Sequence, residues 1–376
     1  MNEDKATRYH RLKRRASLLA TALSASLLLF FVLSGWSASL RDVAASASGS
    51  SFVLTIVLYV VMVVLLGEAI GLPLGFYQGV TLERRYELST QPTSRWWVDQ
   101  AKGLALALVF SVAGALLVWW LLRASPDRWW IIAAVCFAGI IIALAQLAPV
   151  FLLPIFYDVK PLEREALATR LVALADRAGA PVLGVFEWRL SDRTKKANAA
   201  LTGIGRTRRI LLSDTLLAEH SDDEIEVVLA HELAHHVHRD IWKGIALEAT
   251  LIALGFYLAD QVLTRLVGSF GLLAKDDIAG LPLLVLTAGA VSIVLLPLAN
   301  ALSRAHERSA DRFALEMTKN AAAFVSAMKR LGAQNLAEEH PSRLVELLFY
   351  SHPPMTARID AAYIWAAHGG FVIDKR

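Results

Sequence analysis

Residues 224–240 read EIEVVLAHELAHHVHRD and gather four histidines with acidic residues in one short run. If this run is helical, His231 and His235 lie one turn apart on the same face. Two imidazoles at that spacing can bind the same zinc ion, each at about 2.0–2.1 Å. Glu232 is rotated by about 100° from His231, so its carboxylate can reach a water on the metal. H-E-x-x-H is typical of zinc hydrolases with a glutamate base, although a plain polar helix face can also contain it.

The other two histidines of the run fit one metal ion less well. His238 follows His231 by seven residues, about 10.5 Å along a helix axis, which is too far for one helix to wrap one small ion. His236 points to another face. We interpret both as solvated or membrane-interface histidines. A catalytic zinc requires three protein ligands, so we expect the third from elsewhere in the chain.

The segment HERSADRF, residues 306–313, is the best source of that ligand. Glu307 would complete a set of two histidines and one glutamate. Asp311 follows it by one turn and could accept a hydrogen bond from the free ring N–H of a ligating histidine. His306 is the rival ligand. The segment could also be an ordinary charged helix face, because it carries a basic stripe formed by Arg304, Arg308 and Arg312.

A zinc site of this kind, with one ion per chain, would hydrolyse peptide bonds. Zinc lowers the pKa of its bound water and polarises a carbonyl. Glu232 would take the proton from the attacking water and hand it to the leaving amine. The tetrahedral oxyanion needs a further donor. His352 or Arg358, in SHPPMTARI at 351–359, could supply it, although their positions in the sequence do not show this.

The composition indicates an integral membrane protein. Of the 376 residues, 56% are hydrophobic and only 19% are charged, and the mean hydropathy is +0.47. Crossing a bilayer core takes about 20 apolar residues. Six stretches qualify: 16–40, 52–77, 100–122, 129–153, 245–268 and 281–302. We expect a mainly α, polytopic membrane protein with six transmembrane helices, or seven if 129–157 hides another, and a small cytoplasmic α+β region. The first stretch could be a signal peptide, but its length favours a retained anchor.

The loop charges predict the orientation and the organisation of the chain. Lysine and arginine are concentrated in residues 1–15 and recur in the loop 78–99. The loops near 41–51, 123–128 and 269–280 contain fewer of them. This distribution favours a cytoplasmic N-terminus. The alternation of the stretches then places two polar regions, 154–244 and 303–376, on the cytoplasmic side, where they can meet. The expected order is a four-helix membrane region (1–153), the α+β insert (154–244), two membrane helices (245–302) and a helical C-terminal region (303–376), together one domain.

The α+β insert has recognisable element signals. Ser221 and Glu224 match a capping box, which places the start of a helix directly before the histidine run. Helical periodicity covers 161–180, and Gly179 and Pro181 close it. Three segments are predicted as strands: 181–190, 198–205 and 208–217.

Other classes of site find little support. Nucleic-acid binding needs a clustered basic face with stacking aromatics, and RTRRI at 206–210 is too short for that. Cys136 is the single cysteine, so neither an intramolecular disulfide nor a cysteine-based zinc site can form.

Several motifs together resemble one known family. They are LERRYELST (82–90), DQAKG (99–103), PIFYDVKPLE (154–163), KKANAALTGIG (195–205), RRILLSDTLL (208–217), VLAHELAHHVHRD (228–240), ERSADRFA (307–314) and SHPPMTARI (351–359). Their order, spacing and chemistry resemble the integral-membrane zinc endopeptidases typified by the type I CAAX prenyl protease. The HtpX-type stress protease is a more distant relative. The eukaryotic members have seven membrane helices where we count six.

The resemblance implies a role for each matching residue. The zinc ligands would be His231, His235 and Glu307, with Glu232 as the base and Asp311 behind a ligand. It further implies that His352 and Arg358 bind the scissile carbonyl and its oxyanion. Asn198 and Ala199 would lie on an edge strand that pairs with the extended substrate backbone. The substrate would be a C-terminal tail, with or without a lipid, or a damaged membrane protein for an HtpX-like enzyme.

The sequence also bears on the membrane in which the protein resides and on two alternative functions. The richness in alanine, arginine and leucine favours a bacterial inner-membrane protein whose site faces the cytoplasm. A zinc transporter or sensor is the first rival, but transport sites usually lie near the bilayer midplane, and the histidines lie at a helix end. An inactive scaffold is the second rival, and the presence of every expected catalytic residue argues against it. The oligomeric state stays open.

Overall fold

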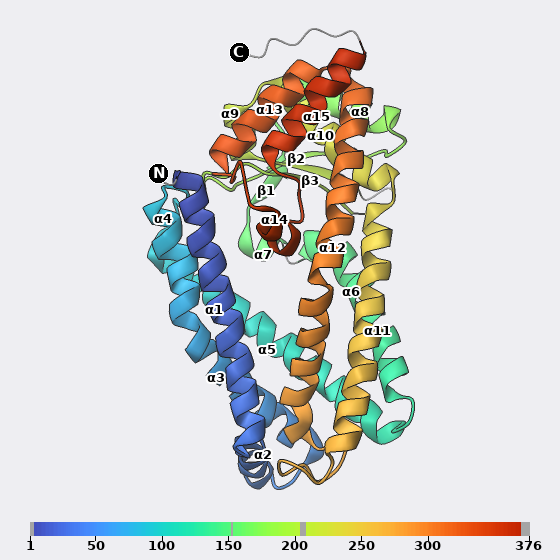
Figure 1. Cartoon of the computed structure of the whole chain (residues 1–376). Helices are drawn as coiled ribbons and strands as arrows, with labels where there is room; N and C mark the ends of the chain where they lie inside the picture. The colour runs from blue at the N-terminus through green and yellow to red at the C-terminus, as the bar shows by residue number, and fades with distance from the viewer. Residues whose placement is uncertain (1–3, 152, 204–207, 370–376) are drawn as a thin grey trace.

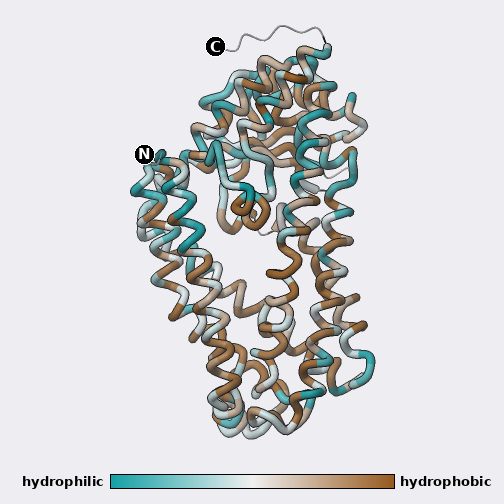
Figure 2. The backbone as a smooth tube through the Cα atoms, viewed as in Figure 1, coloured by the Kyte–Doolittle hydropathy of each residue, from teal (hydrophilic) through white to brown (hydrophobic). Residues whose placement is uncertain are grey.

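A computed structural model describes residues 4–151, 153–203 and 208–369. Long helices fill the lower part of the view in Figure 1, and a small sheet covered by shorter helices fills the upper part. Figure 2 shows that the long helices are mainly hydrophobic and that the upper part is mixed. The chain is therefore a polytopic helical membrane protein with a small sheet region, as the composition predicts.

Among the described residues, five helices are long and apolar enough to cross a membrane. They are α1 (Lys5–Leu33), α3 (Phe52–Phe76), α5 (Thr93–Ala124), α11 (Asp240–Leu266) and α12 (Leu281–Thr318). Only 6% to 22% of the residues in their most apolar windows are buried, so these helices present apolar side chains outward, as lipid requires. The remaining predicted stretch forms α6 (Trp129–Phe151), of which 129–145 counts as a shorter apolar helix.

The prediction of one helix over 16–40 is wrong at both ends. Helix α1 begins at Lys5 and ends at Leu33, and a second helix, α2 (Trp36–Ala47), follows at once. Gly35 has a φ of 76°, a left-handed conformation that stops the first helix and reverses the chain. At about 1.5 Å per residue, the 12 residues of α2 are too few to cross a bilayer.

The described residues of 129–157 also leave no room for a seventh membrane helix. They form α6 and the four-residue helix α7 (Leu153–Phe156). Helix α3 continues through a π-helical turn, η1 (Tyr77–Leu82), into the short helix α4 (Glu83–Arg85).

The sheet has four strands in the order β1-β2-β4-β3. They are β1 (Val159–Pro161), β2 (Gly184–Trp188), β3 (Ala199–Thr202) and β4 (Arg209–Ser213). Strand β3 pairs with β4 alone and in antiparallel register, with Ala199 opposite Leu212, so β3 is an edge strand. The strand predicted over 198–205 thus forms within its described residues, and 204–205 lie outside them.

The predicted strand 208–217 is too long. Strand β4 ends at Ser213, whose side chain accepts a hydrogen bond from the Leu216 amide and so begins helix α9 (Asp214–Glu219). Serine is a favoured residue at that position because its hydroxyl satisfies an unpaired helical N–H.

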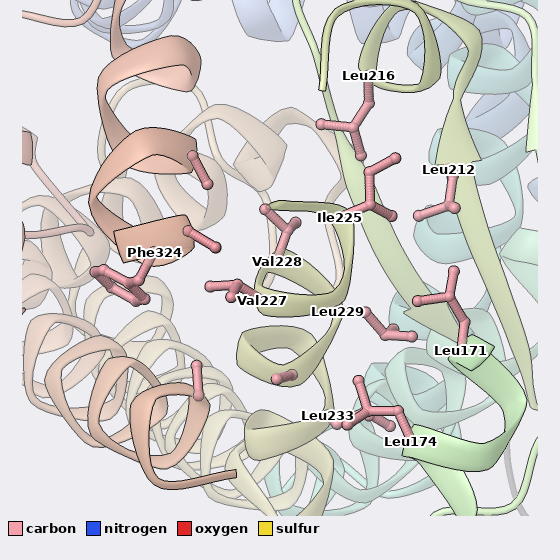
Figure 3. Close-up of a cluster of buried hydrophobic side chains, with 14 of the residues drawn as sticks. Leu171, Leu174, Leu212, Leu216, Ile225, Val227, Val228, Leu229, Leu233 and Phe324 are labelled. Atoms are coloured by element: carbon pink, nitrogen blue, oxygen red, sulfur yellow. The ribbon is translucent and has the colours of Figure 1, made fainter. Parts of the chain in front are cut away.

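Helices pack against the sheet and enclose an apolar core. Four of them are α8 (Glu165–Arg177), α10 (Asp222–Val237), α13 (Ala321–Gln334) and α15 (Met355–His368), and α14 (Arg343–Phe349) lies before the last of these. Helix α10 buries Ile225, Val228, Leu229 and Leu233 in this core, against side chains of α8, β4 and α13 (Figure 3). Because one side of α10 is fixed in this way, the orientation of its histidines is fixed too.

The capping box at the start of α10 forms as predicted. The Ser221 hydroxyl accepts a hydrogen bond from the Glu224 amide, and the Glu224 carboxylate accepts one from the Ser221 amide. Glu224 also binds Ser326 on α13, so the same residue joins two helices.

Ser221→Ala is expected to lower the free energy of unfolding by about 1 kcal/mol, because it leaves the Glu224 amide without its partner. The measurement is denaturation of the detergent-solubilised chain. Ser221→Thr keeps the hydroxyl and should retain most of the stability. Equal losses in both variants would contradict the capping role.

Candidate active site

Helix α10 places three of the predicted site residues around one point. The rings of His231 and His235 lie 5.0 Å apart between centroids and are nearly perpendicular, at 87°. His231 is buried, and the side chain of His235 is 22% exposed. Glu232 lies between them in the sequence, and burial raises the pKa of its carboxyl, which suits a group that must accept a proton.

Glu307 comes to this pair from α12. Its Oε2 is 3.2 Å from Nε2 of His231, and its Oε1 is 3.3 Å from Nε2 of His235. One ligand atom from each of the three residues lies within 4.8 Å of the others. The neighbouring His306, which was the rival ligand, lies instead with its Nε2 3.8 Å from Asp240.

These three residues fit a metal ion. The Glu307 Oε2 atom is buried and, among the described residues, has no hydrogen-bond partner in good alignment, although Nδ1 of His352 is 2.8 Å away. A buried carboxylate oxygen without such a partner is costly, and a cation at the point where the three side chains converge would remove that cost. Two imidazole nitrogens and one carboxylate form a donor set typical of catalytic metal sites with an open position.

Asp311 supports the first histidine from behind. Its Oδ1 is 2.9 Å from Nδ1 of His231, and it lies one turn after Glu307 on α12. An N–H of His231 that donates to this carboxylate leaves Nε2 free as a ligand. Asp311 in turn accepts two hydrogen bonds from Arg358, at 2.8 Å from Nε and 2.5 Å from Nη2.

Arg358 and His352 differ in how accessible they are at the site. Arg358, on α15, is buried and its guanidinium is bound to Asp311. Burial would lower its pKa, but the attraction of Asp311 outweighs that effect and the pKa is raised. The side chain of His352 is 60% exposed and reaches Glu307, so it is the more accessible of the two groups.

Asp240 is a site residue that the sequence reasoning missed. It is the first residue of α11, and its Oδ2 is 3.1 Å from Nδ1 of His235. Lys243 binds the other carboxylate oxygen at 2.9 Å. Asp240 therefore does for His235 what Asp311 does for His231. The signal was available in the sequence, since the acid follows the second histidine by five residues, just after the end of its helix.

Asp240→Asn is expected to weaken metal binding by about 10–100-fold, the usual cost of removing such a carboxylate. The measurement is competition with a calibrated chelator. Asp192→Asn is a matched control, because Asp192 pairs with Arg95 on the surface. Unchanged affinity in Asp240→Asn would show that the His235 ring is held without this bond.

A pocket of about 400 Å³ opens beside the three converging side chains. His231, Glu232, His352 and Arg358 line one part of it. Asn198 and Ala199, at the start of β3, line another part, and the apolar side chains Leu216, Val228, Met328, Leu331 and Met355 form much of the rest. Six of the nine predicted site residues thus line this pocket. The other three are His235, Glu307 and Asp311, and each lies close to His231 or to Glu307.

His236 and His238 lie apart from this constellation. His238 follows the last turn of α10, where its ring packs against Phe313 and its Nδ1 is 3.3 Å from the Ser309 hydroxyl. His236 is partly buried, and burial lowers its pKa. Neither belongs to the group of residues that could hold a metal ion.

The loop that contains LERRYEL joins the membrane helices to the pocket. Glu83 binds Tyr9 of α1 and accepts a hydrogen bond at 2.9 Å from Lys196, two residues before Asn198. Lys13 reaches the same carboxylate at 3.0 Å. The loop therefore fixes the segment that leads into β3.

Two models of known protein families together match nearly all of this chain. The model for peptidase family M48 matches residues 161–366, and the model described as CAAX prenyl protease N-terminal, five membrane helices, matches residues 2–158. A crystal structure of S. mikatae Ste24p has the same fold, with a TM-score of 0.86 at 24% identity over 95% of this chain and 88% of that one.

Two relatives are similar in sequence over most of their length. An uncharacterized metalloprotease, YhfN, of Bacillus subtilis is 32% identical over 89% of this chain and 79% of its own. CAAX prenyl protease 1 of Saccharomyces cerevisiae is 29% identical over 79% of this chain and 69% of its own. The chain therefore belongs to peptidase family M48 and is a multi-pass membrane metalloprotease of the CAAX prenyl protease type.

Proposed function

We propose that this metalloprotease binds one zinc ion between His231, His235 and Glu307 and uses Glu232 as its general base. The observation that carries the proposal is the convergence of these three side chains beside Glu232, which is half-buried and lines the pocket. When bound, zinc would supply the Lewis acidity that polarises the scissile carbonyl and lowers the pKa of water.

The residues of the chain would transfer the proton, stabilise the oxyanion and orient a metal ligand. Glu232 accepts the proton of the attacking water and returns it to the leaving amine. His352, exposed at the pocket, donates to the oxyanion that develops on the substrate. Arg358 lines the pocket and also holds Asp311, so it acts on the oxyanion and on the orientation of His231.

The substrate is proposed to bind as an extra strand on β3. That edge is open among the described strands, and Asn198 and Ala199 lie at its end beside the metal site. Backbone pairing of this kind gives affinity with little demand on sequence. The names of the relatives favour a C-terminal, lipid-modified tail as the substrate. The basic N-terminal segment favours a cytoplasmic site, where the polar regions 154–244 and 303–376 would meet. The richness in alanine, arginine and leucine favours a bacterial inner membrane.

Substrate trapping tests the proposal. Glu232→Gln is expected to keep zinc and the bound peptide, because it removes the base and no ligand. The variant would be isolated from its own membrane, its metal content measured, and the retained peptides identified by mass spectrometry. Lipidated C-terminal tails support the proposal, and internal segments of damaged membrane proteins favour an HtpX-like role. Metal flux into proteoliposomes without hydrolysis of any peptide would contradict it.

A further inference from the structure

A second pocket lies beside the metal site, at the other end of β3. Its volume is about 580 Å³, and the predicted ligand His235 forms part of its wall. Residues 201–203 line this pocket, whereas Asn198 and Ala199 line the first one. The metal site therefore lies between two pockets that follow the same edge strand.

The ionisable groups of the second pocket are arginines and histidines. Arg208 and Arg239 line it together with His236, and none of the described residues in its wall is an aspartate or a glutamate. His236 lies close enough to Arg208 for the arginine charge to contribute to its lowered pKa, after the larger effect of burial. The first pocket differs, because Glu232 and Glu338 line it.

Both arginines lack a partner in the part of the chain that the structure describes. The Nε atom of Arg208 is buried there without a hydrogen-bond partner. Arg239 has a φ of 57°, in the left-handed region where glycine carries no strain. Strained backbone of this kind is found preferentially at functional sites. The pocket thus presents two unneutralised guanidinium groups, which are well suited to bind a carboxylate through paired N–H donors.

We propose that this pocket binds an acidic side chain of the peptide substrate, about three to five residues from the scissile bond. An extended chain advances about 3.3 Å per residue, so a peptide that pairs with β3 beside Ala199 reaches Thr202 after about three residues. The inference rests on the proposed pairing of the substrate with β3. Ile241 and Trp242 also line the pocket, at the start of membrane helix α11. A phospholipid headgroup is therefore the alternative ligand, but contact with β3 and His235 favours the substrate.

Cleavage of charge-scanned peptides tests this inference. The full-length protein in phosphatidylcholine vesicles would be given fluorogenic peptides with glutamate or lysine at one position at a time. We expect the glutamate peptide to have a kcat/KM about tenfold above that of the lysine peptide, at a position three to five residues from the cut. Arg208→Glu and Arg239→Glu should abolish or reverse this ratio. Arg265→Glu, the same change at the far end of α11, should keep it.

The readout is the ratio of kcat/KM for the glutamate peptide to kcat/KM for the lysine peptide, measured within each variant. A general loss of activity lowers both values and leaves this ratio unchanged. Equal cleavage of both peptides by the unaltered chain would overturn the inference and leave the proposed function intact. Failure to cleave any peptide would overturn both. The inference would also be overturned if Arg208→Glu and Arg239→Glu both kept the preference for the glutamate peptide. A third outcome would overturn it as well. If phosphatidylglycerol in the vesicles activates the unaltered chain, and the two variants lose only this activation, the pocket binds a lipid headgroup.

Discussion

Replacing Glu232 with glutamine is expected to lower kcat for peptide cleavage by about 10²–10⁴-fold, the usual contribution of a positioned general base. Glutamine has nearly the same shape but cannot take a proton from the attacking water. The carboxyl is half-buried and lies outside the three-residue group that could hold the metal, so zinc content should not change. The measurements are single-turnover cleavage of a fluorogenic peptide and elemental analysis of the purified variant.

Glu226→Gln is the matched control for this change. Glu226 lies on the same helix, but its carboxylate pairs with Arg170 and Arg177 on the surface. It should cleave at a rate close to that of the unaltered chain. Full activity in Glu232→Gln would mean that another group accepts the proton, and the proposed mechanism would fall.

Glu307→Gln is expected to abolish activity by a different route, through loss of the metal. An amide is a poor replacement for the carboxylate that faces both His231 and His235 at 3.2–3.3 Å. Zinc affinity should fall by more than about 100-fold, the upper cost of removing a residue that only supports a ligand. Because a ligand bound to the folded state stabilises it, the rise in Tm on adding zinc should also disappear.

Glu316→Gln serves as the control for the third ligand, because Glu316 lies on the same helix and pairs with Arg312 at 3.5 Å on the surface. It should retain zinc, activity and the zinc-dependent rise in Tm. A Glu307→Gln protein that kept all three would show that the metal has a different third ligand, and His352, 2.8 Å from Glu307, would be the first candidate.

Much of the site could be predicted because its chemistry depends on local spacing. His231 and His235 lie one turn apart on any helix, and the Ser221 capping box fixed where that helix begins. Glu307 and Asp311 were predicted in the same way, since both lie on one face of the helix that continues from the last membrane stretch. The alternation of loop charge then predicted that the two segments meet.

The remaining features depend on single residues whose effect is not periodic. Hydropathy could not show that Gly35 takes a left-handed conformation and divides the first apolar stretch into α1 and α2. It could not show that the Ser213 hydroxyl ends β4 and begins a helix. Asp240 was missed because its contact with His235 depends on the angle between α10 and α11, which is set by the positive φ of Arg239.

The two long helices that carry Asp240 and Glu307 limit how this enzyme can be handled. Any continuous fragment that contains both His231 and Glu307 also contains α11 and most of α12, and both of these are long and apolar enough to cross a bilayer. A water-soluble truncation that ended before α11 would keep the HELAH helix and lose its third ligand. Inhibitor screens and crystallisation trials therefore need the intact chain in detergent or lipid, and a tagged catalytic fragment would be an inert reagent.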